Sequence, residues 1–194
     1  MDTGEKQVVR CIYILPIGSI HQPILRTVAQ EITLRFNCRC KIIPSLEAPS
    51  YAFEPDREQY SSGKILKQIL NNETLCSLLK GTVKILGIVD VDLCTPILTF
   101  VFGEAQLGGK AATVSLCRLR QEFYGLPPDP KLLLERAKKE ALHELGHTFG
   151  LVHCSDPKCV MYFSNSVRNI DVKTDSFCRS CSMLLCENKQ SERE

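Results

Sequence analysis

The chain has 194 residues, 44% of them hydrophobic, and its 24 basic and 22 acidic side chains give a formal net charge of +2. This length suits one domain, and the hydrophobic content is typical of a globular chain that buries a proper core. No basic block resembles a phosphate-binding tract, so we expect no nucleic-acid partner. We interpret the short cluster Arg136–Lys139 as the solvated face of a helix.

The first residues and the cysteine content indicate where the protein is found. The start, MDTGEKQVVR, mixes charges of both signs and lacks the apolar region of a signal peptide. The longest apolar stretches are far shorter than the roughly 20 residues that cross a membrane. Eleven cysteines without a secretion signal suit a reducing compartment, so we expect a cytoplasmic protein with no membrane association.

The first half of the chain alternates between strand-like and helix-like patterns. In chain order we predict a strand at Val8–Pro16, a helix at Gln22–Phe36, a strand at Cys38–Ile43, a polar proline-bearing stretch to about Ser62, helices at Lys64–Leu70 and Glu73–Leu79, and strands at Val83–Asp90, Ile97–Phe102 and Ala112–Cys117. This order indicates an α/β layer with a largely parallel sheet. A turn at Gly103–Gly109 would make the last two strands an antiparallel hairpin.

A loop at Gln121–Pro130 leads into one long helix. Asp129 suits the N-cap, and Pro130 suits the first helical position, where its missing N–H is no loss. The pattern then predicts a helix from Pro130 to Phe149, which Gly150 ends. A further helix is expected near Asp175–Cys186.

Residues 143–153 read HELGHTFGLVH and contain three of the four histidines of the chain. His143 and His147 are one helical turn apart, so both can bind the same ion. Glu144 would project beside the metal and suits a general base. A left-handed turn at Gly150 would let His153 supply a third imidazole. Three neutral imidazoles leave the fourth position of a zinc ion open, as a catalytic site requires.

Gly146 lies inside the predicted helix, where glycine costs about 1 kcal/mol relative to alanine, which indicates close approach by another segment. The alternative interpretation treats the histidines as ordinary core or surface residues. That interpretation leaves the glutamate and glycine at fixed offsets unexplained.

The extended pattern H-E-x-x-H-x-x-G-x-x-H resembles that of the metzincin clan of zinc peptidases, in which a methionine follows in a tight turn beneath the metal. After the third histidine the chain continues as C-x₄-C-x-M and later as C-x₂-C. This combination resembles the archaemetzincins. The resemblance implies that Met161 is the Met-turn residue and that a second, structural zinc is held by Cys154, Cys159, Cys178 and Cys181.

A set of four cysteines agrees with a structural site because it leaves no position for substrate. The alternative is that these four are buried reduced thiols, although paired C-x₄-C and C-x₂-C spacings are a recognised zinc pattern. Cys186 is a weaker candidate ligand for the same site. The remaining cysteines are expected to pack as small apolar residues: Cys11, Cys38, Cys40, Cys76, Cys94 and Cys117.

We therefore predict a single zincin-like (metzincin) α/β domain over residues 1–194, with a twisted mixed sheet, a long active-site helix and a small Cys-rich C-terminal part. Residues 1–150 would form the N-terminal subdomain and residues 151–194 the C-terminal one. The predicted activity is hydrolysis of peptide bonds in a peptide or protein substrate. A catalytic and a structural zinc ion would be the cofactors, with Glu144 activating the zinc-bound water.

Other functions stay open from the sequence. A zinc-stabilised module could bind peptides without cutting them. A metal-dependent ribonuclease is less favoured, because the bacterial family with similar histidine spacing has no glutamate after its first histidine. Within a peptidase, Tyr162 could reach the oxyanion or simply pack, and Ile97–Phe102 could be the sheet edge that pairs with an extended peptide.

Overall fold

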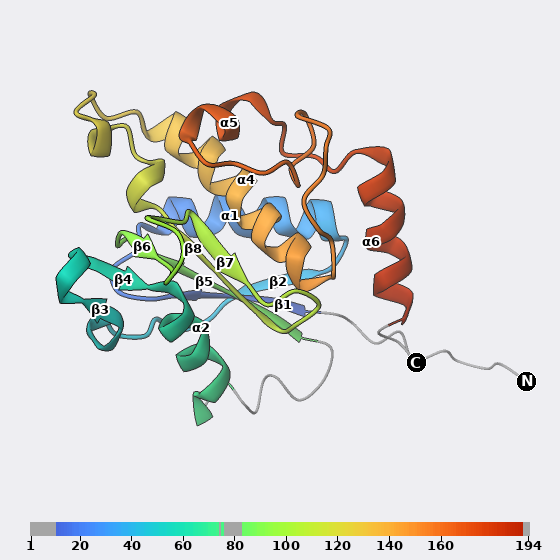
Figure 1. The fold of residues 1–194 in the computed structure, drawn as a ribbon. Coiled ribbons are helices and arrows are strands. Elements are labelled where there is room, and N and C mark those ends of the chain that lie inside the picture. Colours follow the sequence, from blue (N-terminus) through green and yellow to red (C-terminus); the bar gives the residue numbers. More distant parts are fainter. Residues whose placement is uncertain (1–10, 74, 76–82, 192–194) are drawn as a thin grey trace, which may run out of the picture.

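Five strands form the central sheet of the computed structural model, which describes residues 11–73, 75 and 83–191 (Figure 1). They are β1 (Cys11–Pro16), β2 (Arg39–Ile42), β5 (Val83–Val89), β7 (Gly103–Ala105) and β8 (Ala111–Ser115). Their spatial order is β2-β1-β5-β8-β7. Neighbours pair in parallel except β7, which runs antiparallel to β8 and forms one edge. The predicted α/β architecture with a mixed, largely parallel sheet is confirmed.

Helices cover both faces of this sheet, and each face has its own apolar core. The helices α1 (Gln22–Phe36) and α4 (Pro130–Thr148) lie on one face, and α2 (Ser62–Asn71) lies on the other (Figure 1). Successive strand residues point to opposite faces, so Leu86 packs with α1 and α4 whereas Ile85 packs with α2. Burial on both faces explains why the inner strands β1 and β5 are apolar at most positions, whereas the edge strand β2 carries Arg39 and Lys41.

A second, smaller sheet arises largely from the polar stretch before Ser62. Its strands are β3 (Phe53–Glu54), β4 (Gln59–Ser61) and β6 (Leu93–Cys94), in the order β3-β4-β6. The strand predicted at Ile97–Phe102 is wrong. Apart from a bridge between Val101 and Leu93, these residues form an irregular segment, and Ile97 is 93% exposed. The first strand of the predicted hairpin is instead β7, so the turn spans residues 106–110.

The carboxyl-terminal part contributes α5 (Val167–Val172), which was not predicted, and α6 (Arg179–Ser191), which begins and ends later than expected. The first of these helices corrects the interpretation of the basic cluster. Arg136 is buried, and its guanidinium lies 2.8 Å from the carboxylate of Asp171 on α5. Lys139 donates to the Ile170 carbonyl at 3.0 Å. The cluster is therefore a packed contact between two helices, because α5 covers it.

Four 3₁₀ turns complete the described structure, at Ser50–Ala52, Pro55–Arg57, Cys117–Leu119 and Glu122–Tyr124. Across the ranges that the structure describes, no helix has the length and apolar character needed to cross a membrane. Residues 8–10 of the first predicted strand, most of the predicted helix Glu73–Leu79 and Cys76 lie outside the described residues.

Candidate metal centre

The local sequence places the histidine motif at the end of α4. The helix begins after Asp129, whose carboxylate accepts a hydrogen bond from the Leu132 N–H at 3.0 Å, and Pro130 occupies its first turn. Phe149 is the C-cap, and Gly150 has a φ of +82°, in the left-handed region that glycine favours. The chain therefore turns back at Gly150, as the motif predicted.

Backbone carbonyls orient the two histidines of α4. Nδ1 of His143 lies 2.9 Å from the Val160 oxygen, and Nδ1 of His147 lies 2.7 Å from the Leu151 oxygen. Each Nδ1 therefore carries the proton, and each Nε2 presents a lone pair. The two Nε2 atoms lie 3.1 Å apart. Two nitrogens held about 2.0 Å from a tetrahedral zinc ion would lie roughly 3.3 Å apart, so the pair fits one ion.

His153 joins this pair from the loop after Gly150. One ligand atom from each of the three histidines lies within 4.8 Å of the others. The His153 ring stacks on that of His143 with centroids 5.3 Å apart, and the Phe163 ring packs edge-on against it at 5.0 Å. His143 is buried whereas His153 is exposed. The three imidazoles could hold one metal ion with a side open to solvent.

The three histidines are neutral near physiological pH. Burial lowers the pKa of His143 well below its ordinary value, and the positive charge of Lys173 acts in the same direction. Burial is also the main cause that lowers the pKa of His147 and of His153. Neutral imidazole is the form that binds a metal, so protons compete weakly for these nitrogens.

Glu144 lies beside the histidines, 5% exposed, and lines the same cleft. Burial raises its pKa well above the ordinary value; Glu140 adds to this shift and Lys173 opposes it. A cation held by the histidines would favour the ionised carboxylate. Glu144 could therefore take up and release a proton in the cleft.

A buried ion pair lies one helical turn before Glu144 and was not predicted from the sequence. Lys173 Nζ lies 2.7 Å from Glu140 Oε1, with the side chains 0% and 3% exposed, although the contact lacks the alignment of a hydrogen bond. The same ammonium donates to the Tyr162 carbonyl at 3.4 Å. Glu140 and Glu144 are four residues apart in the sequence, so their position on one face of the helix could have been predicted. No residue near Lys173 in the sequence indicates that it pairs with Glu140.

The histidines lie in a cleft of about 540 Å³. Its walls come from α4, from most residues between 95 and 107, and from residues 152–153 and 163–165. The strand β7 approaches α4 closely at Gly103, where an added Cβ would lie 2.6 Å from Glu144 Cγ and 2.5 Å from the Thr113 oxygen. The sequence predicts a turn at Gly103, but the residue lies in β7, at a position that needs glycine because of this approach.

Met161 lies directly against the end of α4. An added Cβ at Gly146 would lie only 2.4 Å from Met161 Sδ, which confirms the close approach predicted from this glycine. Met161 is fully buried. Val160, the residue before it, supplies the carbonyl that orients His143. The turn through Met161 therefore packs against the end of α4 and orients a histidine.

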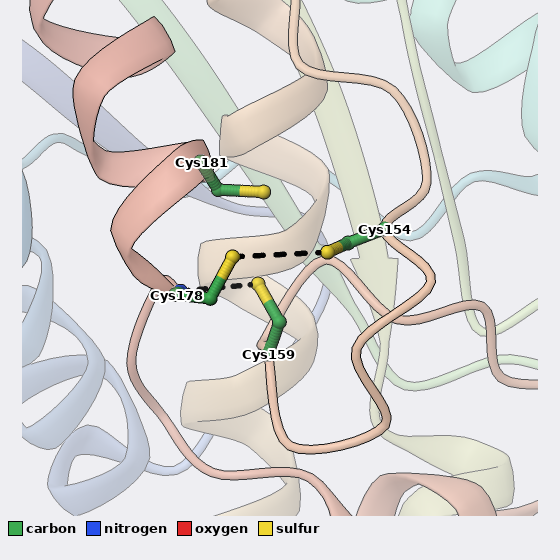
Figure 2. A group of neighbouring side chains, drawn as sticks. All are labelled: Cys154, Cys159, Cys178 and Cys181. Atoms are coloured by element: carbon green, nitrogen blue, oxygen red, sulfur yellow. Dashed lines mark hydrogen bonds between the residues drawn. The ribbon is translucent and has the colours of Figure 1, made fainter.

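The four predicted cysteines form a second cluster, in which all four sulfurs lie within 4.8 Å of one another. Cys154 and Cys159 come from the loop after α4, whereas Cys178 and Cys181 come from the start of α6, and the side chains point toward one another (Figure 2). The Cys154 and Cys178 sulfurs lie 3.8 Å apart. Four sulfurs about 2.3 Å from a tetrahedral zinc ion would lie roughly 3.8 Å apart, whereas a disulfide is near 2.0 Å.

Backbone N–H groups donate to the sulfurs of this cluster. The Asp156 N–H donates to Cys154 Sγ at 3.4 Å, and the Cys178 N–H donates to Cys159 Sγ at 3.3 Å. A backbone hydrogen bond from Cys181 lowers the pKa of the Cys178 thiol, whereas burial followed by hydrogen bonds with neighbouring thiols raises the pKa of Cys181. One thiolate thus opposes ionisation of the next, and a divalent cation would relieve this repulsion.

Other residues singled out from the sequence belong to neither cluster. Cys186 is exposed on α6 and does not join the cysteine group. Of the cysteines expected to pack, Cys94 is buried and four are half-buried: Cys11, Cys38, Cys40 and Cys117. Tyr162 does not line the cleft, whereas the next residue, Phe163, does.

A mixed sheet with an antiparallel edge strand, and a long helix that ends in H-E-x-x-H beside that edge, define a zinc metallopeptidase with a zincin-like fold. The profile of Peptidase family M54 matches residues 21–187. The chain belongs to this family, and its relatives are archaemetzincins.

The relatives match over most of their length. Archaemetzincin of Methanocaldococcus jannaschii is 42% identical over 170 residues, which cover 88% of this chain and 89% of the relative. Archaemetzincin of Pyrococcus furiosus is 42% identical over 184 residues, covering 91% and 92%. The crystal structure of the Methanopyrus kandleri archaemetzincin superposes with a TM-score of 0.80 at 35% identity, covering 95% of this chain and 98% of that one.

Proposed function

We propose that this zinc peptidase binds its catalytic zinc through His143, His147 and His153 and cuts peptide bonds with Glu144 as the general base. The observation that carries the proposal is the convergence of three neutral imidazoles with a buried carboxyl in one cleft. Neutral nitrogens suit a zinc ion, and three ligands leave a position for water or substrate.

Zinc bound there would act as a Lewis acid and lower the pKa of a water ligand. The chain's own residues do the rest of the work. Glu144 takes a proton from the attacking water and later donates it to the leaving amine. Its raised pKa suits this, because the carboxyl must hold the proton between the two steps. The carbonyls of Val160 and Leu151 keep the imidazoles of His143 and His147 in place throughout.

The substrate would bind as an extended strand along β7, which replaces Ile97–Phe102 in this role. The Ser115 N–H donates to the Phe102 oxygen at 2.8 Å, and the Gln106 N–H donates to the Ala111 oxygen at 3.0 Å. Because antiparallel pairing alternates, the backbone groups of Gly103 and Ala105 point away from β8 and toward the free edge. A peptide added at this edge would pass in front of the histidines.

A second, structural zinc ion would be held by Cys154, Cys159, Cys178 and Cys181. The fit of the sulfur separation to a tetrahedron supports this, as does the absence of these residues from the cleft lining. The ion would tie the loop that carries His153 to α6. We also propose that the chain forms a single domain, with the segment from residue 151 onward as its C-terminal subdomain.

The test is Glu144→Gln compared with Glu135→Gln, which changes an exposed carboxylate on the same helix. Zinc content should stay the same in both variants, because Glu144 is no ligand. Hydrolysis of a quenched fluorescent peptide library should fall by about 10²–10⁴-fold in Glu144→Gln alone, the range typical of a lost general base. Retained hydrolysis would reject the role of Glu144, and a wild type that binds zinc and peptide without cleavage would indicate a binding module.

A further inference from the structure

The segment between β6 and β7 forms part of the cleft wall without belonging to any strand over residues 95–100. Its apolar side chains face outward: Leu98 is 48% exposed and lines the cleft together with the half-buried Phe100. Phe100 packs against the core, but the exposed residues 96–99 of this irregular segment gain little from core packing. Its conformation must therefore be fixed by other contacts.

Arg57 supplies those contacts to the main chain. Its guanidinium donates to the carbonyls of Thr95 at 2.7 Å, Leu98 at 2.8 Å and Thr99 at 2.9 Å. The third nitrogen of the guanidinium is also bonded, because Nε donates to Gln59 Oε1 at 3.2 Å. The planar fork of arginine holds these carbonyls in one arrangement, which the three rotatable donors of lysine cannot reproduce.

A second arginine holds the aromatic side chain of the same segment. The Arg118 guanidinium lies 4.2 Å from the centre of the Phe100 ring, a cation–π contact. Arg118 is itself fixed by Asp92, with Nη2 and Oδ2 at 2.8 Å, and Gln59 donates to the same oxygen at 2.9 Å. Through Gln59 and Asp92, the two arginines belong to one hydrogen-bonded network.

We propose that Arg57 is a positioning residue that fixes the apolar wall formed by Leu98 and Phe100, and that this wall selects peptides with bulky apolar side chains beside the scissile bond. The inference rests on the proposed function of the cleft. The wall lies on the same chain segment as β7, so a peptide along that edge would place side chains against it. Apolar side chains gain from burial against Leu98 and Phe100 only while the wall keeps its shape.

The experiment compares Arg57→Met with Arg120→Met in a zinc-loaded Glu144→Gln background, which keeps bound peptide intact. Arg120 is a matched control: like Arg57 it is a half-buried arginine outside the cleft lining, but its guanidinium pairs with Asp90 instead of with the carbonyls of the wall. The probes are two fluorescent octapeptides that carry either leucine or alanine at the two central positions. Fluorescence anisotropy gives their dissociation constants, and hydrogen exchange reports the amides of residues 97–101.

We expect the Glu144→Gln protein that retains Arg57, and the Arg120→Met control, to bind the leucine peptide about tenfold more tightly than the alanine peptide. This ratio is in the range for apolar subsites. In Arg57→Met the ratio should fall to about two or less, and residues 97–101 should exchange about tenfold faster. Arg57→Lys should give a binding ratio and an exchange rate between those of Arg57 and Arg57→Met. The melting temperature of each variant shows whether the chain folds normally.

Unchanged exchange in Arg57→Met would show that Arg57 does not fix the segment. Faster exchange with an unchanged ratio, equal binding of the two peptides to the Arg57 protein, or no binding of either, would show that the wall does not select. Any of these results overturns the inference. Failure of this inference can be told apart from failure of the proposed function, because cleavage by the wild-type protein is measured independently. Selective binding without cleavage would reject the peptidase mechanism alone.

Discussion

The histidine and cysteine clusters meet at the bond between His153 and Cys154, yet their surroundings differ. The histidine cluster has three members and lies in the cleft, whereas the cysteine cluster has four members, none of which lines the cleft. Carbonyl oxygens accept hydrogen bonds from the histidine rings, whereas backbone N–H groups donate to the sulfurs. The first set keeps nitrogen lone pairs free in neutral ligands, and the second stabilises negative charge on sulfur.

This difference shows how the turn through Met161 can support both clusters. The Cys154 N–H donates to the Met161 oxygen at 2.9 Å, so the loop that carries His153 is closed onto the turn beneath α4. His153 is exposed, and its ring contacts only the neighbouring rings of His143, His147 and Phe163 among the described aromatic contacts. The cysteine cluster anchors the next residue, and the third histidine keeps its place without being buried. An open site beside a closed one thus gains rigidity without losing access.

The largest effect should come from breaking the closed cluster. Cys178→Ala removes one of the four sulfurs, so the chain should lose the proposed structural zinc and the free energy of unfolding should fall by more than about 4 kcal/mol. Zinc at the histidines should also bind more weakly, because His153 loses its anchor. Metal analysis and urea denaturation measure both effects.

Cys186→Ala is the matched control for that change, since Cys186 is exposed on α6 and lies outside the cluster. It should leave zinc content and stability unchanged. Equal behaviour of the two variants would mean that the four sulfurs are ordinary thiols, and the contrast between the clusters would disappear.

A smaller effect should come from the contact that links the two clusters beneath α4. Gly146→Ala would place a Cβ 2.4 Å from Met161 Sδ, so we expect overpacking to lower the free energy of unfolding by about 1–3 kcal/mol. Helix propensity alone predicts the opposite sign. Gly63→Ala in α2 is the control, because its Cβ would meet nothing within 4 Å. Denaturation curves in which both alanine variants are more stable than the wild type would show that the Met161 side chain moves aside at little cost.

The smallest effect concerns pH at the open cluster. Three ordinary imidazoles with pKa values of about 6.5 would lose roughly fiftyfold in zinc affinity between ~pH 7.5 and ~pH 6.0, through proton competition. The folded protein lowers all three pKa values, so protonation begins at lower pH and the loss should be less than about tenfold. Competition with a chromophoric chelator at the two pH values measures this loss, and a fiftyfold decrease would contradict it.

Features that depend on neighbouring residues were predictable. The start of α4 follows from Asp129 and Pro130, and its end from Gly150, because capping and a left-handed turn are local. The close approach at Gly146 was also predicted, since a helical glycine has a local cost that needs a reason. The strand at Ile97–Phe102 failed because apolar character alone cannot show whether a segment has a partner strand.

Two further features required contacts between distant segments. The basic cluster around Arg136 reads as a solvated surface until α5 covers it. Gly103 reads as a turn residue until β7 approaches Glu144. In both cases the deciding neighbour is far away in the chain, and its arrival depends on how the whole sheet and its helices pack.

By itself the sequence determined which residues meet at the two sites: three histidines with a glutamate beside them, and four cysteines, at spacings that a helix, a glycine turn and paired cysteines can bring together. These spacings work because helix geometry and tight turns are fixed by local backbone sterics. Only the tertiary structure decided which strand borders the cleft, that Lys173 neutralises the buried Glu140, and that Arg57 holds the cleft wall. Those outcomes depend on burial and charge between segments that meet only after folding.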